Sequence, residues 1–273
     1  MLSSVRALLA GVLDYAGLFP PAGLEMADAV ANYAEYRGHE HAWMLGRFVA
    51  PIHRLDELAE TGFPLTAIAG HNLASHAGQL FTRGVHAVEI KVSSETEIHE
   101  AREIVPPGLE VYFEIPVMAS LVPSVVEARG RAKIRTGGLT HGCFPAAGDL
   151  ARFIAACAAA RLPFKATAGL HHALRSVHPI TADPGGPSGW MYGFLNVFLA
   201  AAFVHHGMPV EDALSVLEET SPEAFVFDEE GVTWEGWRLT APQLSETRCQ
   251  FALSFGSCSF EEPVADLRKL GLL

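Results

Sequence analysis

Charged residues and cysteines are scarce in this 273-residue sequence. Charged side chains make up 18% of it, hydrophobic ones 49%, and the formal net charge is −12. Basic residues form no stripe, which argues against a nucleic-acid partner or an anionic membrane surface. The four cysteines form no CxxC pair, so neither a zinc ribbon nor a disulfide framework is indicated. Reduced thiols favour a cytoplasmic protein.

Long hydrophobic runs are also missing. A membrane-spanning helix needs about 20 apolar residues. The longest apolar run, residues 194–204, contains Asn196 and ends before two histidines. The apolar residues 1–13 are followed by Asp14 and a Pro-Pro turn rather than by a small-residue cleavage site. We therefore expect them to belong to the fold and predict no membrane partner.

Short apolar runs alternate with amphipathic stretches along the chain. Strands buried on both faces are expected at residues 45–51, 65–69, 87–92, 111–116, 132–136 and 164–168. Helices are expected at residues 26–36, 54–60, 73–83, 94–103, 121–129 and 148–161. A first strand near residues 12–18 and a last one near 251–255 give about eight βα units, the number that closes a parallel barrel.

This pattern predicts an α/β fold: a single (β/α)8 TIM-type barrel over residues 1–273. The alternative is an open doubly wound sheet, but no GxGxxG turn follows the first strand. An insertion is predicted between the last two strands, because residues 170–250 exceed the loop and helix that a barrel needs there. This insertion could be a lid or an oligomer interface, which leaves a homo-oligomer open.

Local signals predict the content of the insertion. A Pro- and Gly-rich loop is expected at residues 183–189, and helices at 190–206 and 209–219. A hairpin is expected around residues 229–231, with its strands at 225–228 and 232–234.

Charged residues interrupt several predicted strands. They are Glu89 and Lys91 on one face of the fourth strand, Glu114 near the end of the fifth, Lys133 and Arg135 on one face of the sixth, and Lys165 on the seventh. Charges within core strands are costly unless they are paired, so they tend to mark active sites. A structural ring of ion pairs is the alternative. We expect these side chains to converge at the carboxyl ends of the strands.

Two lysines on neighbouring strands indicate a specific chemistry. An amine that lies beside a second cation and is partly desolvated holds its proton weakly, so it can form a Schiff base with a carbonyl group. The second lysine and a carboxylate can then transfer protons. Lys133 and Lys165 are the candidate amines, and Glu89 and Glu114 are the candidate carboxylates.

Three short motifs end the late strands: Lys-x-x-Thr-Gly from Lys133, Lys-Ala-x-x-Gly from Lys165 and Phe-Gly-x-x-Ser from Phe255. Their order resembles deoxyribose-phosphate aldolase, a class I aldolase on a (β/α)8 barrel. The resemblance implies that Lys133 forms the Schiff base and that Lys165 perturbs it. It also implies that Glu89 stands near the position of a catalytic aspartate.

The resemblance implies that the last motif forms a phosphate-binding turn at Gly256, Ser257 and Ser259. A glycine turn that opens a helix presents free backbone N–H groups and the positive end of the helix dipole. The serine hydroxyls would add donors. The alternative is that Ser259 caps the helix that follows. Whether Cys258 is a reactive thiol stays open.

A divalent metal ion is an alternative cofactor. His171 follows the seventh strand, where site residues gather, and only one of residues 171–172 is expected to face the mouth. With Glu89, Glu114 and His141 it could form a metal site of mixed nitrogen and oxygen ligands. No HExxH motif or closely spaced acidic motif supports such a site.

We therefore predict a lyase of the class I aldolase type, without a cofactor, that acts on a small phosphorylated or carboxylated carbonyl compound. The expected substrate-binding residues are Lys91, Arg135, His171, Asp14, Gly256, Ser257 and Ser259. Asp14 is included because it stands opposite the final strand of a closed barrel. Two alternatives remain: a metal-dependent lyase or isomerase that uses Glu89, Glu114 and His171, and a non-catalytic barrel that binds a small anion.

Overall fold

Eight parallel strands close into a barrel in a computed structural model that describes residues 1–58, 61–70, 72–181 and 185–273. The strands are β1 (Leu13–Tyr15), β2 (Leu45–Pro51), β3 (Leu65–Ala69), β4 (Val85–Lys91), β5 (Glu110–Glu114), β6 (Arg131–Arg135), β7 (Phe164–Thr167) and β13 (Ala252–Ser257). Their order around the barrel is β1-β13-β7-β6-β5-β4-β3-β2. The predicted (β/α)8 TIM-type barrel is confirmed.

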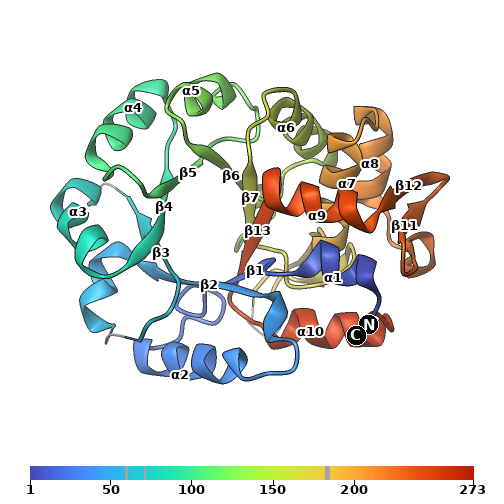
Figure 1. The fold of residues 1–273 in the computed structure, drawn as a ribbon, viewed down its shortest axis with the longest axis horizontal. Helices are drawn as coiled ribbons and strands as arrows, with labels where there is room; N and C mark the ends of the chain where they lie inside the picture. The colour runs from blue at the N-terminus through green and yellow to red at the C-terminus, as the bar shows by residue number, and fades with distance from the viewer. Residues whose placement is uncertain (59–60, 71, 182–184) are drawn as a thin grey trace.

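Helices surround the barrel (Figure 1). They are α1 (Ser3–Leu9), α2 (Met26–Arg37), α3 (Leu73–Thr82), α4 (Glu95–Ile104), α5 (Val122–Glu127), α6 (Ala147–Ala159) and α10 (Glu261–Lys269). The helix expected at residues 54–60 is instead a 3-10 helix, Ile52–Glu57, and residues 59–60 lie outside the described residues. Ile52 and Leu55, three residues apart, are both buried, as the three-residue turn of a 3-10 helix allows.

Both faces of the strands are buried, but the two faces differ in chemistry. Val88, Ile90 and Phe113 alternate with inward-facing residues and pack beneath the helices. Inside the barrel, charged side chains such as Glu89 and Lys133 stand where aliphatic layers usually fill a TIM barrel. The barrel interior is therefore built for charge rather than for hydrophobic packing alone.

The chain between β7 and β13 forms an additional layer. It contains β8 (Ser176–Pro179), β9 (Ser188–Met191), α7 (Phe194–His205), α8 (Val210–Glu218), β10 (Val226–Phe227), β11 (Gly231–Trp234), β12 (Trp237–Thr240) and α9 (Ala241–Gln250). The expected hairpin is present as β10 and β11, and β12 extends it to a third strand. The helix expected from residue 190 begins at Phe194, because the preceding residues pair with β8. Residues 183–184 of the expected loop lie outside the described residues.

Helix α7 is apolar apart from Asn196 in its buried part, because it is enclosed in this layer. Its residues from Phe194 to Phe203 are buried, and α6, α8, α9 and β13 pack around it. Within the described ranges, no helix has the length and apolar character needed to cross a membrane.

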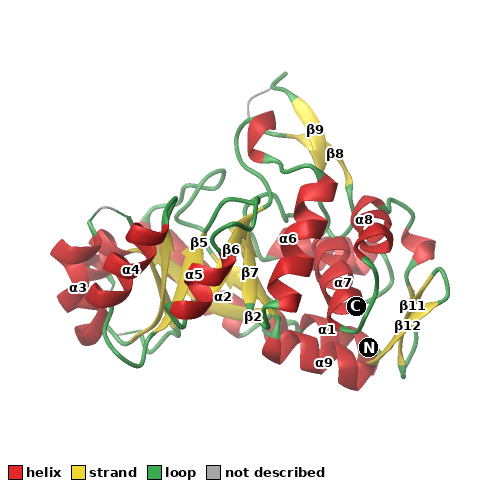
Figure 2. Cartoon of the chain, turned by 90° about the horizontal axis from the view of Figure 1, so that it is seen from above, coloured by secondary structure: helices red, strands yellow, loops and turns green. Residues whose placement is uncertain are grey.

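The β8–β9 hairpin stands out at one end of the molecule, and both termini lie toward the opposite end (Figure 2). The hairpin follows β7, so it rises from the carboxyl ends of the barrel strands. Sequence analysis missed this hairpin. It matters for function because TIM barrels carry their sites at this end.

The glycine turns that follow β6 and β7 are in close backbone contact. Thr136 Oγ1 donates a hydrogen bond to the Ala168 carbonyl oxygen at 2.6 Å. A Cβ atom on Gly137 would lie 2.7 Å from Gly169 Cα and 2.9 Å from the ring of Phe144. These two motif glycines are therefore required by the close approach of two backbones.

We predict that Gly137→Ala lowers the free energy of unfolding by about 1–3 kcal/mol, because the added methyl group overpacks this contact. Gly142→Ala is the matched control, since a Cβ atom there meets nothing within 4 Å. Denaturant unfolding of both variants measures the difference. Equal losses of unfolding free energy in the two variants would contradict a requirement for glycine at this backbone contact.

Candidate active site

A chain of ion pairs crosses the barrel interior. Lys133 Nζ lies 2.7 Å from Glu89 Oε2 and 2.8 Å from Glu114 Oε2. Lys165 Nζ lies 2.5 Å from Glu89 Oε1 and 2.6 Å from Asp14 Oδ2. The two lysines therefore hold the same Glu89 carboxylate, one on each oxygen atom.

The carboxylates at both ends of this chain of ion pairs have further hydrogen-bond donors. Arg135 Nε donates to Glu114 Oε1 at 3.0 Å, and Ser254 Oγ donates to Asp14 Oδ2 at 2.8 Å. The backbone N–H of Arg47 donates to the other Asp14 oxygen at 2.7 Å. Three carboxylates thus face three cations, so this buried network is neutral, as stable burial of charge requires. Sequence analysis missed Ser254 and Arg47.

Strand register brings these side chains together. Lys133 pairs with Lys165 across β6 and β7, and with Glu114 across β5. The ring of Tyr112, two residues before Glu114 on β5, has its centroid 5.4 Å from Lys165 Nζ. Period-two alternation therefore places the network on the inner face of the barrel.

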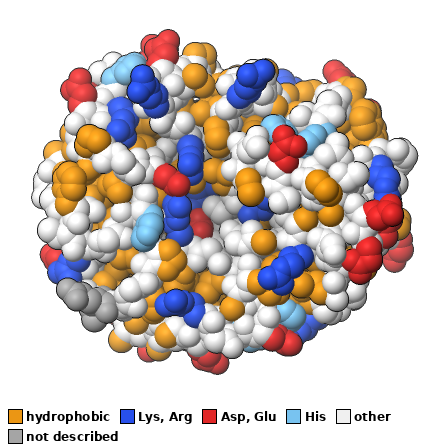
Figure 3. All heavy atoms as spheres, in the orientation of Figure 1, with side chains coloured by type: hydrophobic (Ala, Val, Ile, Leu, Met, Phe, Trp, Pro, Cys, Tyr) orange, Lys and Arg blue, Asp and Glu red, His pale blue; other side chains and the backbone are white. Residues whose placement is uncertain are grey.

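A second ionic cluster lies near the amino ends of the strands. Glu110 Oε2 lies 2.8 Å from a guanidinium nitrogen of Arg47 and 2.6 Å from one of Arg131. The molecule is seen from this end in Figure 3, where Lys, Arg, Asp and Glu side chains gather around a central hollow. Glu110, Tyr112 and Glu114 share one face of β5, so the alternation of polar residues in this strand was the available sequence signal.

Electrostatics fix the charge states of Glu89 and Lys165 in the buried network. Burial alone would raise the pKa of the Glu89 carboxyl, but Lys133 and Lys165 lower this pKa to about 2. Burial would lower the pKa of Lys165, but Asp14 and Glu89 outweigh it and raise this pKa. Lys165 is therefore an ammonium at neutral pH. The expected lowering by a neighbouring cation is not found at Lys165, because the Glu89 carboxylate lies between the two amines.

The network forms the floor of a cavity of about 1220 Å³ at the carboxyl ends of the strands. Three of the four lysines in the chain, Lys91, Lys133 and Lys165, line this cavity. The lining also contains the expected site residues Glu89, Glu114, Arg135, His171 and Gly256. Asp14 is not in the lining, because it lies behind Lys165 and holds its ammonium group.

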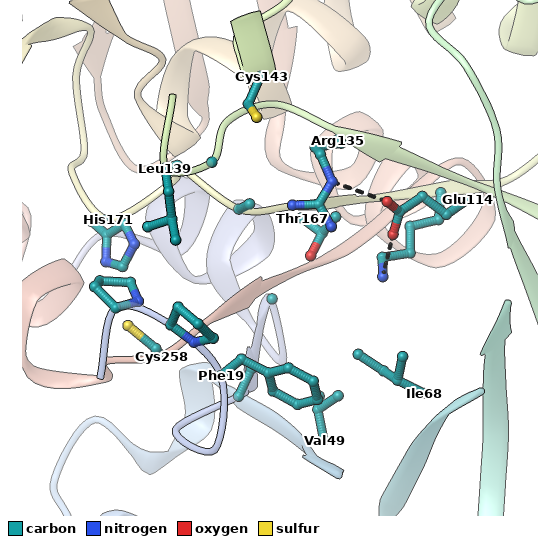
Figure 4. Close-up of a pocket in the computed structure, with 18 of the residues that line it drawn as sticks. Phe19, Val49, Ile68, Glu114, Arg135, Leu139, Cys143, Thr167, His171 and Cys258 are labelled. Atoms are coloured by element: carbon teal, nitrogen blue, oxygen red, sulfur yellow. Dashed lines mark hydrogen bonds and ion pairs between the residues drawn. The ribbon is translucent and has the colours of Figure 1, made fainter. Parts of the chain in front are cut away.

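The cavity has walls of two kinds. Ion-paired Glu114 and Arg135 lie on one side, and Phe19, Val49 and Ile68 lie on another (Figure 4). The β8–β9 hairpin adds His178, Pro179 and Met191, and Ile180 follows β8. The predicted insertion therefore contributes directly to the lining.

Two adjacent histidines line the cavity. His171 Nδ1 lies 3.0 Å from Glu262 Oε2, and His172 Nδ1 lies 2.9 Å from Asp266 Oδ2. The ring of His172 also stacks on that of His178, with centroids 3.4 Å apart. The expectation that only one of these histidines faces the mouth is wrong. Strand β7 ends at Thr167 and Gly169 has φ +75°, so strand alternation no longer applies.

The turn after β13 differs from a phosphate-binding turn in its hydroxyl groups. Ser257 is buried and its Oγ accepts from the backbone N–H of Ser259 at 3.3 Å. Ser259 Oγ accepts from the backbone N–H of Glu262 at 3.1 Å, which is the capping alternative. Neither serine lines the cavity, whereas Gly256 and Cys258 do. Burial raises the pKa of the Cys258 thiol, so an activated thiolate is not indicated.

The alternative metal ligands do not converge. Glu89 and Glu114 are both bound by Lys133, and His171 is paired with Glu262. No group of three His, Cys, Asp or Glu side chains in residues 1–58, 61–70, 72–181 and 185–273 has the geometry of a metal site. The set of Glu89, Glu114 and His171 is therefore corrected: Glu89 and Glu114 share Lys133 as a partner, and His171 pairs with Glu262.

No protein-family model and no curated protein sequence matches this chain. TIM barrels host many unrelated reactions, so the fold alone does not indicate an activity. The chemistry must therefore be inferred from the side chains of the cavity.

We predict that Glu89→Gln lowers the free energy of unfolding at pH 7 by on the order of 3 kcal/mol, because two buried ammonium groups lose their shared carboxylate. The Glu89 pKa is depressed from about 4.5 to about 2 in the folded state. Its contribution is therefore complete above about pH 4.5 and is lost as the pH falls through 2. Urea unfolding at pH 7 and pH 3 measures the difference in unfolding free energy between wild type and variant, called the gap below.

The gap should be smaller at pH 3 than at pH 7. Glu100→Gln, at an exposed position of α4, is the matched control and should change little at either pH. A gap for Glu89→Gln that does not depend on pH would contradict the ionic role of Glu89.

Proposed function

We propose that this chain is a lyase of the class I aldolase type that acts on a small anionic carbonyl compound. One observation carries the proposal: Lys133 is buried at the floor of a large cavity, with a carboxylate oxygen on each side at 2.7 and 2.8 Å. A desolvated amine flanked by two carboxylates can pass its proton to one of them, and the neutral amine can then form a Schiff base. The resemblance to deoxyribose-phosphate aldolase implies the same chemistry.

Lys133 is the preferred nucleophile over Lys165. Asp14 and Glu89 raise the pKa of Lys165 and hold it as an ammonium group. Lys133 also lies between two carboxylates, but one of them, Glu114, is shared with the exposed Arg135 at the cavity. A proton of Lys133 can pass to Glu114 when a substrate displaces the ion pair, and Lys165 remains charged behind Glu89.

The charge balance of the network suits the intermediate. The neutral Lys133 amine adds to the carbonyl carbon, and the carbonyl oxygen leaves as water. The resulting iminium carries the same positive charge as the ammonium group that it replaces between Glu89 and Glu114. Carboxylates already in position stabilise this charge without reorganisation of the site. A carboxylate then accepts the substrate hydroxyl proton as the carbon–carbon bond breaks and its electron pair forms an enamine. The enamine takes up a proton at carbon, and hydrolysis of the resulting iminium releases Lys133.

Two cations at the mouth are suited to hold an anion. The exposed Lys91 side chain makes no ion pair with any residue of the described ranges. The Nη groups of Arg135 are not hydrogen-bonded within the described part of the chain, since only Nε binds Glu114. Free guanidinium and ammonium donors are typical of sites for carboxylate or phosphate.

We predict that borohydride reduction in the presence of a substrate carbonyl, tested with pyruvate and with simple aldehydes, adds mass to Lys133. Peptide mass mapping locates the adduct. Lys133→Arg should abolish it, because the guanidinium group does not form a Schiff base under these conditions. Lys269→Arg, which changes an exposed lysine, is the matched control and should retain it.

An adduct that persists in Lys133→Arg, or that maps to Lys91 or Lys165, would reject Lys133 as the nucleophile. Ligand binding without any adduct or turnover would instead support the non-catalytic barrel.

A further inference from the structure

The cavity has an apolar side that the Schiff-base chemistry does not use. Phe19 comes from the loop after β1, Val49 from β2 and Ile68 from β3, and all three face the cavity (Figure 4). The neighbouring lining residues Pro20, Pro21, Pro51 and Ala69 extend this surface. We call Phe19, Val49 and Ile68 with these four neighbours the apolar wall.

Charge is confined to the other side of the cavity. Apart from Glu262 on α10, every described Asp, Glu, Lys and Arg in the lining lies on β4, β5, β6 or β7. Charged side chains therefore gather on one part of the barrel mouth, although Leu139 and Phe144 also line that part and His53 and Asn72 follow the strands of the apolar wall. A ligand that matches this cavity has one anionic end and one apolar end.

The anionic end must lie close to the reacting carbonyl. Lys133 and Arg135 are two residues apart on one face of β6, which separates their Cα atoms by roughly 6.6 Å. Both also bind the same Glu114 carboxylate, at 2.8 and 3.0 Å. An anion held by Arg135 would therefore lie on the same face of β6 as the carbon bonded to Lys133, with the Glu114 carboxylate as a shared neighbour. A carboxylate attached directly to the carbonyl carbon satisfies this geometry.

A distant phosphate fits the structure less well. The hydroxyl groups of Ser257 and Ser259 accept backbone hydrogen bonds and do not line the cavity. The opposite side of the mouth is formed by the apolar wall, beside which His53 and Asn72 are the polar lining residues from the described chain after β2 and β3. Sugar phosphates would therefore place polar hydroxyl groups against apolar side chains.

We propose that the substrate is a 4-hydroxy-2-oxo carboxylic acid with an aliphatic or aromatic group at C4, and this inference rests on the proposed lyase function. Arg135 and Lys91 bind the carboxylate, Lys133 reacts at C2, and the C4 substituent packs on the apolar wall. A cavity of about 1220 Å³ has room for such a ligand.

The reaction balances without a co-reactant. Lys133 Nζ bonds to C2, and the C2 oxygen leaves as water. The C3–C4 bond breaks, its electron pair forms the enamine, and the C4 hydroxyl proton passes to a carboxylate as the aldehyde leaves. C3 then takes up a proton, and water hydrolyses the iminium to release the shorter 2-oxo acid and regenerate the amine.

The test compares cleavage of three substrates: 4-hydroxy-2-oxo-4-phenylbutanoate, 4-hydroxy-2-oxobutanoate and 2-deoxyribose 5-phosphate. We expect kcat/KM to be at least about 10-fold higher for the phenyl compound than for the unsubstituted acid, as for a well-filled apolar pocket. Phe19→Ala and Ile68→Ala should each reduce this preference. Phe81→Ala, at a 69% exposed position, is the matched control and should retain it.

Equal kcat/KM values for the two oxo acids, or a preference for the sugar phosphate, would overturn the inference. A separate measurement distinguishes it from the lyase proposal: calorimetric binding of 3-phenyllactate and lactate, which have no carbonyl to trap. Tighter binding of 3-phenyllactate that weakens in Phe19→Ala supports the ligand class even if borohydride trapping fails. Trapping at Lys133 with no advantage for apolar compounds leaves the lyase proposal standing and rejects the ligand class.

Discussion

The carboxylate of Glu89, shared by two buried ammonium groups, is the interaction on which this barrel depends. Lys133 and Lys165 bind opposite oxygens of one carboxylate, and Asp14 and Glu114 complete their coordination. Without these carboxylates, two like charges would lie side by side in a desolvated interior at a cost of several kcal/mol. The neutral network lets a TIM barrel replace aliphatic interior layers with charge and still close.

The same network can serve structure or chemistry, and its position favours chemistry. A purely structural set of ion pairs gains nothing from a cavity above it, whereas Lys133, Glu114 and Arg135 all line one of about 1220 Å³. The cluster of Arg47, Glu110 and Arg131 at the amino ends shows the contrast: its ion pairs join strand starts and take no part in that lining. The cluster at the amino ends therefore suits a structural role, and the network under the cavity suits the proposed chemical role.

Much of the barrel could be predicted from the sequence, because strands buried on both faces are continuous apolar runs. The bounds of β2 and β3 agree with the prediction residue for residue, and the facing lysines followed from alternation. Ser254 and the backbone of Arg47 could not be found, since their contacts with Asp14 arise only when the barrel closes. The β8–β9 hairpin was hidden because its strands are only four residues long and their apolar Val177 and Trp190 are exposed rather than part of the core. The role of Ser259 also could not be predicted, because its hydroxyl group caps the following helix and this contact depends on the geometry of the loop.

The most direct test of the central claim is a crystal structure of the protein after borohydride reduction in the presence of pyruvate. Continuous density from Lys133 Nζ to C2 of the ligand, with the carboxylate directed toward Arg135, is the predicted result. Density for an unlinked ligand, or a covalent bond to Lys165 instead, would contradict the assignment of Lys133 as the reactive amine.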